Sequence, residues 1–499
     1  MLKKQIHRTA SSSNSKKYNN LKKSTKRKIN KSMLIMSLID VLFTILLVGF
    51  VISLHMVPTK FIVLIAFVLL VLDLLVLFLL KKKKAIFKIV GYVISFFLVI
   101  MSSIGIYYIA KTNSFLNKAF NNASNSYTST YYIVSRVNSP ISSLDDLADS
   151  TIGYYTVIPN IDKAIDEISS KVTITTKKYD DILSNFNDVK RNIIDATIVE
   201  QSIYEALIDT EIGVIKETDY KIVHTFDVSI EEEVEEIIDD GNSFSVYIGG
   251  VDFTEKNTDF NMVVTVNMKT HKILLTSIPR DYYVNVSSYG MHELLGYVGY
   301  SGINTSRKTI EELFGVNIDY YVKISTNSIV GLVNTLGGVQ FCNSGPAFTT
   351  THAVVQGTYD DSRGQKLTVP NGCRTYNGTQ IVRERLAFSD GDRQRQKNCQ
   401  QVMINIFKQM ASFGTITNYS NVLDAVSNLY TTNLSRDMIT DIANETINGA
   451  SWTFEQQSVT GYDSNGYVHM GTVKDYVMSP DEDSVNEAIA NIKKIKAGK

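Results

Sequence analysis

Three long apolar stretches near the N-terminus constrain what this chain can become more than any other feature of its sequence. They cover residues 33–57, 61–80 and 85–110. Each contains a single charged residue: Asp40, Asp73 and Lys88. A helix of about 20 apolar residues can cross the hydrocarbon core of a bilayer. Three such stretches in succession, behind a long leader, are not typical of a cleavable signal peptide. The sequence therefore predicts three retained transmembrane helices.

Positive charge flanks these stretches on one side. The first 32 residues contain 11 Lys and Arg and no Asp or Glu, and residues 81–84 are consecutive lysines. Because Lys and Arg resist translocation, both segments are predicted to be cytoplasmic and residues 112–499 to lie outside the cell. A basic arm can also bind nucleic acid. Next to membrane spans it is better interpreted as an anchor that meets anionic lipid. We predict a multi-pass protein of the cell membrane with no nucleic-acid partner.

The charged residues inside the spans need partners. Asp40 and Asp73 each lie seven residues from a predicted cytoplasmic helix end, a depth of about 10 Å at the helical rise. Lys88 enters from the same side. A charge at this depth is expected to face another helix or water. The sequence favours contacts within the three-helix bundle. An Asp–Lys contact, or a partner such as a capsule-assembly membrane protein, remains open.

The outer part of the chain divides at an acidic run. Residues 231–240 read EEEVEEIIDD, and Gly241 and Asn242 follow. This charge density indicates an exposed helix or linker, and the two residues after it favour a break. We predict four parts: a cytoplasmic arm (1–32), three transmembrane helices (33–111), an accessory domain (112–240) and a larger domain (241–499).

The accessory domain is predicted to be a small α/β unit. Residues 139–155 indicate a short acidic helix followed by a strand, and residues 192–209 indicate a strand followed by a helix. Both segments resemble parts of bacterial extracytoplasmic solute-binding proteins, in which such units line a ligand cleft. Roughly 120 residues make only one lobe of that fold. We favour an accessory domain without a small-molecule ligand.

The larger domain alternates strands with helices. Strands are predicted at residues 244–249, 262–268, 272–278 and 320–324, and helices at 304–314 and 327–336. A last helix begins near Asp392 and carries an apolar stripe from Cys399 to Met410. This alternation indicates an α/β layered domain. The three cysteines are too few for a disulfide scaffold. We hypothesise that Cys342 and Cys373 close the polar segment between them.

Arginine and aspartate are the residues of this domain that could carry chemistry. No Ser-His-Asp order, paired metal histidines, Walker loop or CxxC motif occurs outside the membrane. Asp252 and Asp259 instead flank a short loop after the first strand, and Arg280 and Asp281 end the third. Four arginines and Asp392 cluster within residues 383–395. Guanidinium groups bind phosphate oxygens and carboxylates hold Mg²⁺. The pattern predicts a pyrophosphate site. The alternative is that these arginines and aspartates form surface ion pairs of little consequence.

Four phrases follow one another along the larger domain: TDFNMVVTVNMKTHKILLTSIPRD, SRKTIEELFGVNIDYYVKI, VNTLGGVQF and YNGTQIVRERLAFSDGDRQRQKNCQQVM. From about residue 243 to the C-terminus the chain resembles the LytR-CpsA-Psr (LCP) family, and within it the CpsA-like members. The resemblance implies an extracellular LCP-type α-β-α layered domain of a Gram-positive bacterium. It also implies an enzyme that transfers a glycopolymer, capsular polysaccharide or teichoic-acid-like, from polyprenyl pyrophosphate to peptidoglycan.

The resemblance implies roles for individual residues. Those matching the positions that hold Mg²⁺, or Mn²⁺, are Asp252 and Asp259. Those matching the pyrophosphate-binding positions are Arg280, Arg383, Arg385, Arg395 and the amide of Gln400. The candidate catalytic residues are Arg280, Asp281 and Asp392. Either carboxylate could accept the proton of an attacking sugar hydroxyl, or only orient a neighbouring arginine.

Two departures from the family pattern, and two rival functions, remain. Cys399 stands where relatives have Gln, and we interpret it as a core residue because it heads the apolar stripe. Where relatives have a basic or amide residue that contacts substrate, this chain reads GMHELLGYVGYSG, and His292 either supplies that contact or is an ordinary surface histidine. One rival is a non-enzymatic membrane sensor or attenuator that binds the lipid-linked polymer and regulates capsule assembly. The other is a hydrolase of the same lipid, with water as acceptor.

Overall fold

The computed structural model describes most of the chain in two compact units. The described residues are 32–120, 126–158, 160–208, 214–231, 242–251, 257–288, 290–349, 367–385, 391–410 and 430–499. One unit contains the N-terminal helices up to Asn117 together with Asp437–Ala450, which includes most of α14 (Arg436–Asn448). The other contains Lys118–Arg436 and Ser451–Lys499. The predicted domain boundary at residue 240 lies outside the described residues.

Three apolar helices open the chain, as predicted. They span Ser32–Leu54, Thr59–Lys81 (α2) and Ala85–Asn117, the last within α3 (Ala85–Phe120). All three are long and apolar enough to cross a membrane. α3 continues past the apolar stretch that ends at residue 110, because the polar residues that follow it contain no Pro or Gly to end a helix.

The acidic residues of these helices find partners inside the bundle. The Ser95 hydroxyl donates to Asp40, with Oγ 2.7 and 2.8 Å from the two carboxylate oxygens. Thr44 donates to Asp73 over 2.9 Å. Both aspartates are buried. Among the described ion pairs none joins Lys88 to either aspartate, so these contacts agree with polar packing within the bundle.

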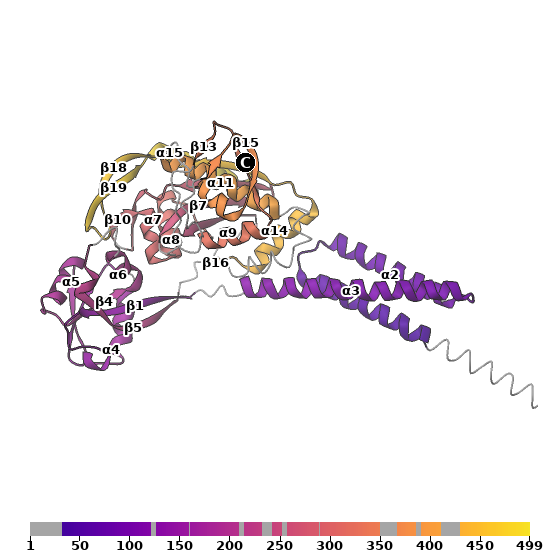
Figure 1. Cartoon of the computed structure of the whole chain (residues 1–499), viewed down its shortest axis with the longest axis horizontal. Helices are drawn as coiled ribbons and strands as arrows, with labels where there is room; N and C mark the ends of the chain where they lie inside the picture. Colours follow the sequence, from indigo (N-terminus) through magenta and orange to yellow (C-terminus); the bar gives the residue numbers. More distant parts are fainter. Residues whose placement is uncertain are drawn as a thin grey trace, which may run out of the picture. The chain divides into compact units, whose positions relative to one another are not determined.

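A five-stranded sheet forms the accessory domain, in the order β3-β2-β4-β1-β5, and Figure 1 labels β4, β1 and β5 of this sheet. The strands are β1 (Ser126–Arg136), β2 (Thr151–Tyr155), β3 (Thr175–Tyr179), β4 (Ala196–Glu200) and β5 (Tyr220–Glu231). The helices are α4 (Ile161–Ser169), α5 (Ile182–Lys190) and α6 (Gln201–Leu207). The predicted strand and helix within residues 192–209 are β4 and α6. Tyr131, Ile152, Ile168 and Phe186 meet in its hydrophobic core.

The larger domain is built on a six-stranded mixed sheet, in the order β16-β11-β6-β7-β8-β17. Its strands are β6 (Ser243–Val251), β7 (Thr258–Asn267), β8 (Lys272–Ile278), β11 (Tyr320–Ser325), β16 (Tyr430–Thr432) and β17 (Thr453–Ser458). Nearly every residue of β6 and β7 is buried. Side chains of a strand alternate between faces. Both faces of the sheet must therefore be covered.

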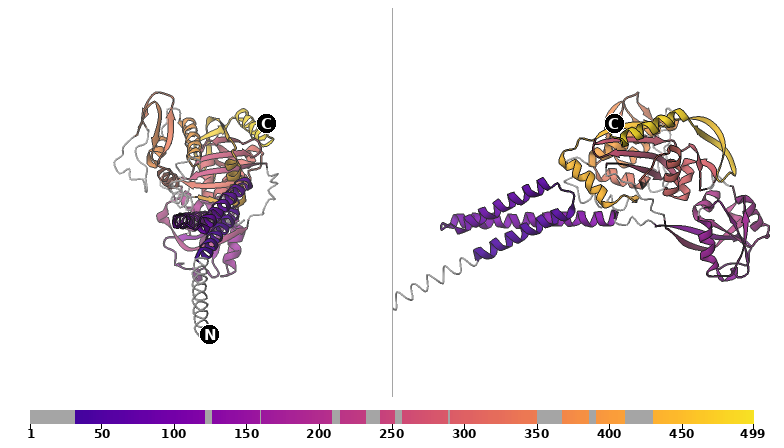
Figure 2. Two further views of the ribbon diagram at one scale, coloured as in Figure 1. Left: turned by 90° about the vertical axis from the view of Figure 1, so that its right-hand side faces the viewer. Right: turned by 180° about the vertical axis from the view of Figure 1, so that it is seen from behind.

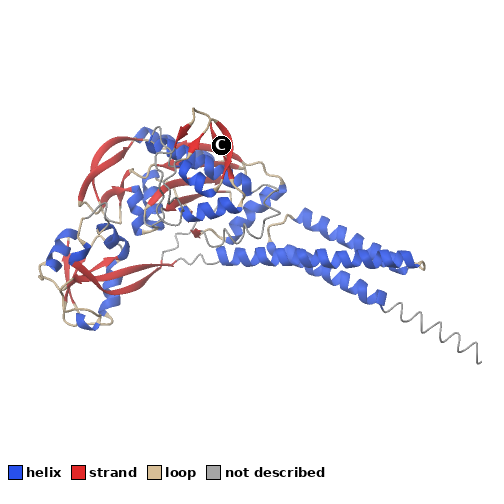
Figure 3. Ribbon diagram, in the orientation of Figure 1, coloured by secondary structure: helices blue, strands red, loops and turns tan. Residues whose placement is uncertain are grey.

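Helices supply that cover. They are α7 (Leu295–Val298), α8 (Ile303–Phe314), α9 (Thr326–Thr335), α10 (Gly378–Arg385), α11 (Gly391–Met410) and α15 (Glu482–Lys496). Ile310 of α8 and Ile492 of α15 pack with Tyr247 and Val263 on one face, and Figure 2 shows α15, in yellow, along the sheet. α9 and α11 contact the strands as well, and Figure 3 shows helices on either side of the sheet. The α-β-α layering is as expected.

Short two-stranded sheets complete the larger domain, and none of them was predicted from the sequence. They are β9 (Tyr283–Val286) with β10 (Met291–Leu294), β12 (Val339–Asn343) with β15 (Gly372–Tyr376), β13 (Phe348–Thr349) with β14 (Thr368–Val369), and β18 (Gly461–Val468) with β19 (Val473–Pro480). Each is a two-stranded sheet of its own, so no long alternating pattern marks it.

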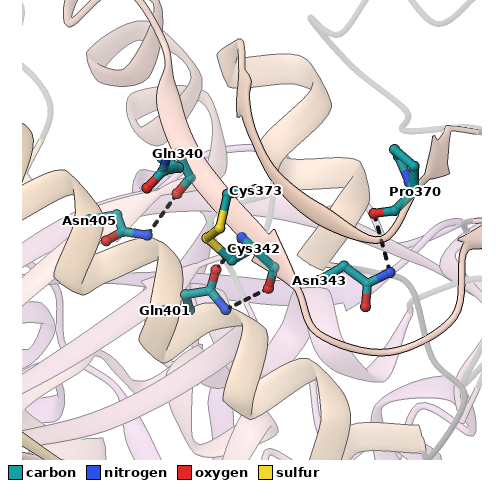
Figure 4. The surroundings of a disulfide bond; sticks show 7 residues. All are labelled: Gln340, Cys342, Asn343, Pro370, Cys373, Gln401 and Asn405. Carbon is teal, nitrogen blue, oxygen red and sulfur yellow. Dashed lines mark hydrogen bonds between the residues drawn. A yellow bond between two sulfur atoms is a disulfide. The ribbon is translucent and has the colours of Figure 1, made fainter.

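A disulfide joins Cys342 and Cys373, as hypothesised (Figure 4). The two residues are directly opposite on the antiparallel strands β12 and β15. The side-chain amide of Gln401 on α11 bonds both backbone groups of Cys342, at 2.5 and 3.1 Å. Asn405, one turn later, donates to the Gln340 carbonyl over 2.7 Å. Helix α11 thus holds this pair of strands, while Cys399 is buried and forms no disulfide.

Candidate functional site

Two consecutive strands bring the predicted site residues together. Asp259 lies at the start of β7, and Arg280 follows the end of β8. These strands are antiparallel, with Asn261 opposite Ile278, so the start of one meets the end of the other. Asp259 Oδ1 is 2.8 Å from Arg280 Nη1, and Asp281 Oδ1 is 3.4 Å from Arg280 Nε. A guanidinium is thus held between two carboxylates.

A pocket of about 160 Å³ surrounds this ion pair. Its lining residues are Asn257, Asp259, Arg280, Asp281, Leu294, Gly296 and Tyr297. The Arg280 side chain is 46% exposed and accessible from solvent. The pocket is therefore polar, charged and open to solvent.

Gly296 permits the close approach that forms one wall. Its N–H donates to the Arg280 carbonyl over 2.8 Å. A Cβ atom at this position would lie 3.3 Å from that carbonyl oxygen and 3.4 Å from Arg280 Cβ. Any other residue would push against the backbone that carries the guanidinium. The glycine thus keeps α7 close against the end of β8.

Tyr297 supplies a neutral hydroxyl beside the guanidinium. Burial raises the pKa of Tyr297 to about 12, although the nearby Arg280 charge opposes the shift. The hydroxyl therefore stays protonated at neutral pH and can donate a hydrogen bond. Its ring centroid lies 4.3 Å from that of His469, in the turn between β18 and β19. A segment far along the chain thus supports this wall.

A buried carboxyl holds the same turn. Glu293 accepts hydrogen bonds from the backbone N–H groups of Leu294, at 3.0 Å, and Met470, at 3.1 Å. Burial raises the pKa of the Glu293 carboxyl to about 7, while these backbone donors lower it. Its proton is therefore lost close to neutral pH, next to the pocket wall.

Oxygen ligands for a divalent cation gather at the pocket. Asn257 Oδ1 is buried and has no hydrogen-bond partner among the described residues. Asp259 and Asp281 add carboxylate oxygens. No group of three His, Cys, Asp or Glu side chains suited to a metal occurs in the described part of the chain. Asp252, the other predicted ligand, lies outside it. These donors fit Mg²⁺, which needs few protein ligands and retains water.

The other predicted site residues belong to helices α10 and α11. Arg383 and Arg385 fall in α10, and Asp392 near the start of α11; their side chains are not among those described. Arg395 is buried in α11. Gln400 is buried too, and its amide donates to the Gln457 carbonyl of β17 over 2.6 Å. Neither Arg395 nor Gln400 lines the pocket around Arg280.

The opposite wall of the pocket was not predicted. In GMHELLGYVGYSG only His292 was singled out, and its ring lies 5.0 Å from that of Tyr283. The wall consists of Leu294, Gly296 and Tyr297 from the same phrase, with Asn257. A glycine between apolar residues, next to an aromatic ring, was the available signal for a close backbone approach.

The match to a known family covers the larger domain and the last part of the accessory domain. A family model, the LytR_cpsA_psr family, matches residues 197–494. The polyisoprenyl-teichoic acid–peptidoglycan teichoic acid transferase TagT of Bacillus subtilis (strain 168) is 29% identical over 203 residues, 39% of this chain and 61% of that protein. The TagU transferase of Halalkalibacterium halodurans is 30% identical over 224 residues, 44% of this chain and 69% of that protein. The chain thus spans about three fifths of the B. subtilis relative.

Solved structures show a likeness as well. A structure described as TagT bound to LIIa-WTA has 23% sequence identity, covers 52% of this chain and 94% of its own, and gives a TM-score of 0.42. The crystal structure of B. subtilis TagV has 18% identity, covers 51% of this chain and 96% of its own, and also gives a TM-score of 0.42.

Proposed function

Because the chain belongs to the LytR-CpsA-Psr family, we propose that it is a membrane-anchored phosphotransferase. It moves a glycopolymer, capsular polysaccharide or teichoic-acid-like, from polyprenyl pyrophosphate to peptidoglycan outside the cell. The observation that carries this proposal is the guanidinium of Arg280, held by Asp259 and Asp281 in a small open pocket. Relatives named as teichoic acid transferases support the same reaction class.

The pocket suits a pyrophosphate better than a sugar. A guanidinium binds phosphate oxygens in bidentate fashion and remains charged at any physiological pH. Arg280 is oriented by two ion pairs yet partly exposed. The protonated hydroxyl of Tyr297 adds a neutral donor. Both groups are in place before substrate binds, so little reorganisation is needed as charge develops on the phosphate.

The reaction needs positioning and charge neutralisation more than a protein nucleophile. A hydroxyl oxygen of peptidoglycan attacks the phosphorus next to the glycan, forming a new P–O bond. The bond to the polyprenyl phosphate breaks, and that phosphate leaves with the electron pair. The hydroxyl proton passes to a carboxylate. Asp281 is at the pocket, and Asp392 is the second candidate base.

Divalent cation binding belongs to the same proposal. Asp252 and Asp259 would hold Mg²⁺, or Mn²⁺, and Asn257 Oδ1, which has no hydrogen-bond partner among the described residues, would be a further ligand. When bound, such an ion neutralises pyrophosphate charge. Asp259 then has two tasks, since it also orients Arg280.

The test uses the full chain in lipid nanodiscs with a labelled polyprenyl-pyrophosphate saccharide, peptidoglycan fragments and Mg²⁺. Arg280→Ala and Arg280→Lys are compared with Arg191→Ala, a surface arginine of the accessory domain. We expect label to reach peptidoglycan in the unmodified chain and in Arg191→Ala, and to fall at least a hundredfold in Arg280→Ala. Tight lipid binding without transfer supports the sensor instead. Sugar phosphate released without acceptor supports the hydrolase.

A further inference from the structure

The accessory domain and the larger domain share a hydrophobic junction. The central sheets of both lie in one compact unit. Val157, Met291 and Met470 each pack against the core of the accessory domain and against the core of the larger domain. Val157 follows β2, Met291 begins β10, and Met470 lies in the turn between β18 and β19. Because close-packed interiors transmit displacements, side chains shared by two cores couple the two domains.

The turn that contains Met470 has an unusual backbone. His469 and Met470 have φ values of 53° and 58°, in the left-handed region. Hairpin turns normally place Gly, Asn or Asp in this conformation, because the Cβ atom of other residues comes too close to a carbonyl oxygen. A methionine stays in such a conformation only where its surroundings fix it, and residues of this kind occur mainly at functional sites.

Two contacts fix this turn. The buried carboxylate of Glu293 accepts hydrogen bonds from the backbone N–H groups of Met470, over 3.1 Å, and of His469. The Met470 side chain packs against the core of the accessory domain. The larger domain therefore supplies one anchor of the turn, through β10, and the accessory domain supplies the other.

The same turn supports the wall of the pocket. The His469 ring lies 4.3 Å from the ring of Tyr297, and Glu293 also accepts from the Leu294 N–H over 3.0 Å. Leu294 and Tyr297 both line the pocket. A second contact from the accessory domain reaches this wall, since α6 touches the short helix η3 (Gly299–Ser301), which directly follows α7. The accessory domain thus meets the wall at two places.

We propose that the accessory domain positions the pocket wall, acting through Val157 and Met470 on Tyr297. This inference rests on the proposed transferase function and gives the accessory domain a part in it. Val157 and Met470 are not among the residues that line the pocket, so they act through the His469 ring and the Glu293 carboxylate. A small displacement of a positioned hydrogen-bond donor slows a reaction that depends on preorganised charge. Loosening the junction should therefore slow transfer in a chain that still folds.

The first test compares two valines in the full chain in lipid nanodiscs. Val172, like Val157, is partly buried and packs against the core of the accessory domain, but it does not pack against the core of the larger domain. We expect Val157→Ala to lower kcat/KM for the lipid donor roughly tenfold and Val172→Ala to leave it unchanged. Val157→Ile should retain most of the activity. Equal losses in the two alanine variants would overturn the inference.

Met470→Gly separates positioning from stability. Glycine adopts the left-handed backbone without strain, but it removes the side chain that meets the accessory core. Because relief of strain offsets lost packing, the melting temperature should change little while kcat/KM for the lipid donor falls roughly tenfold. Met470→Leu should retain most of the activity. A lower melting temperature with full activity would give the turn a purely structural role.

A double-mutant cycle tests the route through Tyr297. Tyr297→Phe removes the hydroxyl donor and should itself lower transfer. If the junction acts through that hydroxyl, Val157→Ala should cost much less in the Tyr297→Phe background than in the unmodified chain. Losses that simply multiply would contradict this route.

Hydrogen–deuterium exchange gives a readout that needs no reaction. The Gly296 N–H donates to the Arg280 carbonyl, so its exchange reports opening of the wall. Val157→Ala should speed exchange over residues 294–298 at least about threefold, and Val172→Ala should not. If the unmodified chain transfers nothing, the proposed function fails, and exchange alone decides whether the accessory domain holds the wall. Unchanged exchange in Val157→Ala would show that it does not.

Discussion

Asp259 Oδ1 and Arg280 Nη1 lie 2.8 Å apart although 20 residues separate the two in sequence. The turn between β7 and β8 folds the chain back on itself and places both at one edge of the sheet. A carboxylate that orients the guanidinium also lowers the net charge that the pocket presents to a phosphate. The Asp259–Arg280 pair therefore sets both the orientation of the guanidinium and the strength with which the pocket binds an anion.

Asp259→Asn is expected to lower kcat/KM for the lipid donor by roughly ten- to a hundredfold. The amide oxygen can still accept from Arg280 but no longer carries the charge that holds it or a cation. The magnesium concentration that gives half-maximal transfer should rise. Asp227→Asn, on strand β5 of the accessory sheet, is the control. An unchanged magnesium dependence would remove Asp259 from the cation site.

Gly296→Ala is expected to reduce transfer roughly tenfold while the chain stays folded. The new methyl group would press on the Arg280 backbone at 3.3–3.4 Å, and small displacements of a positioned group are costly. Gly331→Ala, in α9, meets nothing within 4 Å. It should stabilise the protein by about 0.5–1 kcal/mol. Equal activity of the two variants would show that the wall tolerates a side chain.

The disulfide is expected to stabilise the larger domain. Cys342 and Cys373 are 31 residues apart in sequence, and removing a crosslink over such a loop costs about 2–4 kcal/mol. The Cys342→Ala, Cys373→Ala double variant should melt at a lower temperature than the unmodified chain. Reductant should lower the melting temperature of the unmodified chain by a similar amount and leave the variant unaffected. A reductant effect in the variant would show that the loss of stability does not come from this disulfide, since Cys399 forms none.

Glu293 makes stability depend on pH. Burial raises the pKa of its carboxyl from 4.5 to about 7, so the folded chain binds a proton more tightly than the unfolded chain. Its contribution to the free energy of unfolding is complete below pH 4.5. That contribution falls by about 3 kcal/mol as the pH rises to 7 and above.

Melting curves between pH 5 and 8 check this expectation. Glu293→Gln should show a smaller fall in melting temperature with rising pH than the unmodified chain. Glu487→Gln, at an exposed position on α15, should follow the unmodified chain. Part of the fall will remain, because burial also raises the pKa of Glu200 in the accessory domain to about 7. A steeper fall of the melting temperature with rising pH in Glu293→Gln would show that Glu293 does not cause this pH dependence.

Asp40 and Ser95 are expected to hold two membrane helices together. Asp40→Leu removes the acceptor of the Ser95 hydroxyl and should destabilise the bundle by about 0.6–1.7 kcal/mol. Asp40→Asn keeps an acceptor and should be milder. A chain with Asp40→Cys and Ser95→Cys should crosslink within itself in membranes. Crosslinks to a foreign membrane protein would instead support a partner at this depth.

Local patterns in the sequence determined the parts of this protein. Long apolar runs predicted the spans, and alternation predicted the core strands, because each segment must bury its own apolar surface. Arg280 and Asp281 at a strand end, with Asp259 at the start of its neighbour, indicated the charged half of the pocket. Two antiparallel strands that follow one another in the sequence are brought together by the turn between them, so their contact does not depend on a distant segment.

The tertiary structure alone decided the other half of the pocket and the surface beside it. Gly296 and Tyr297 form a wall because α7 packs against the end of β8, and the β18–β19 hairpin reaches Asp281 from nearly 200 residues away. The same holds for the hydrogen bond that Gln400 donates to the Gln457 carbonyl of β17. Such contacts depend on how distant segments pack. The periodicity of a segment records which of its faces is buried, but not which partner buries it.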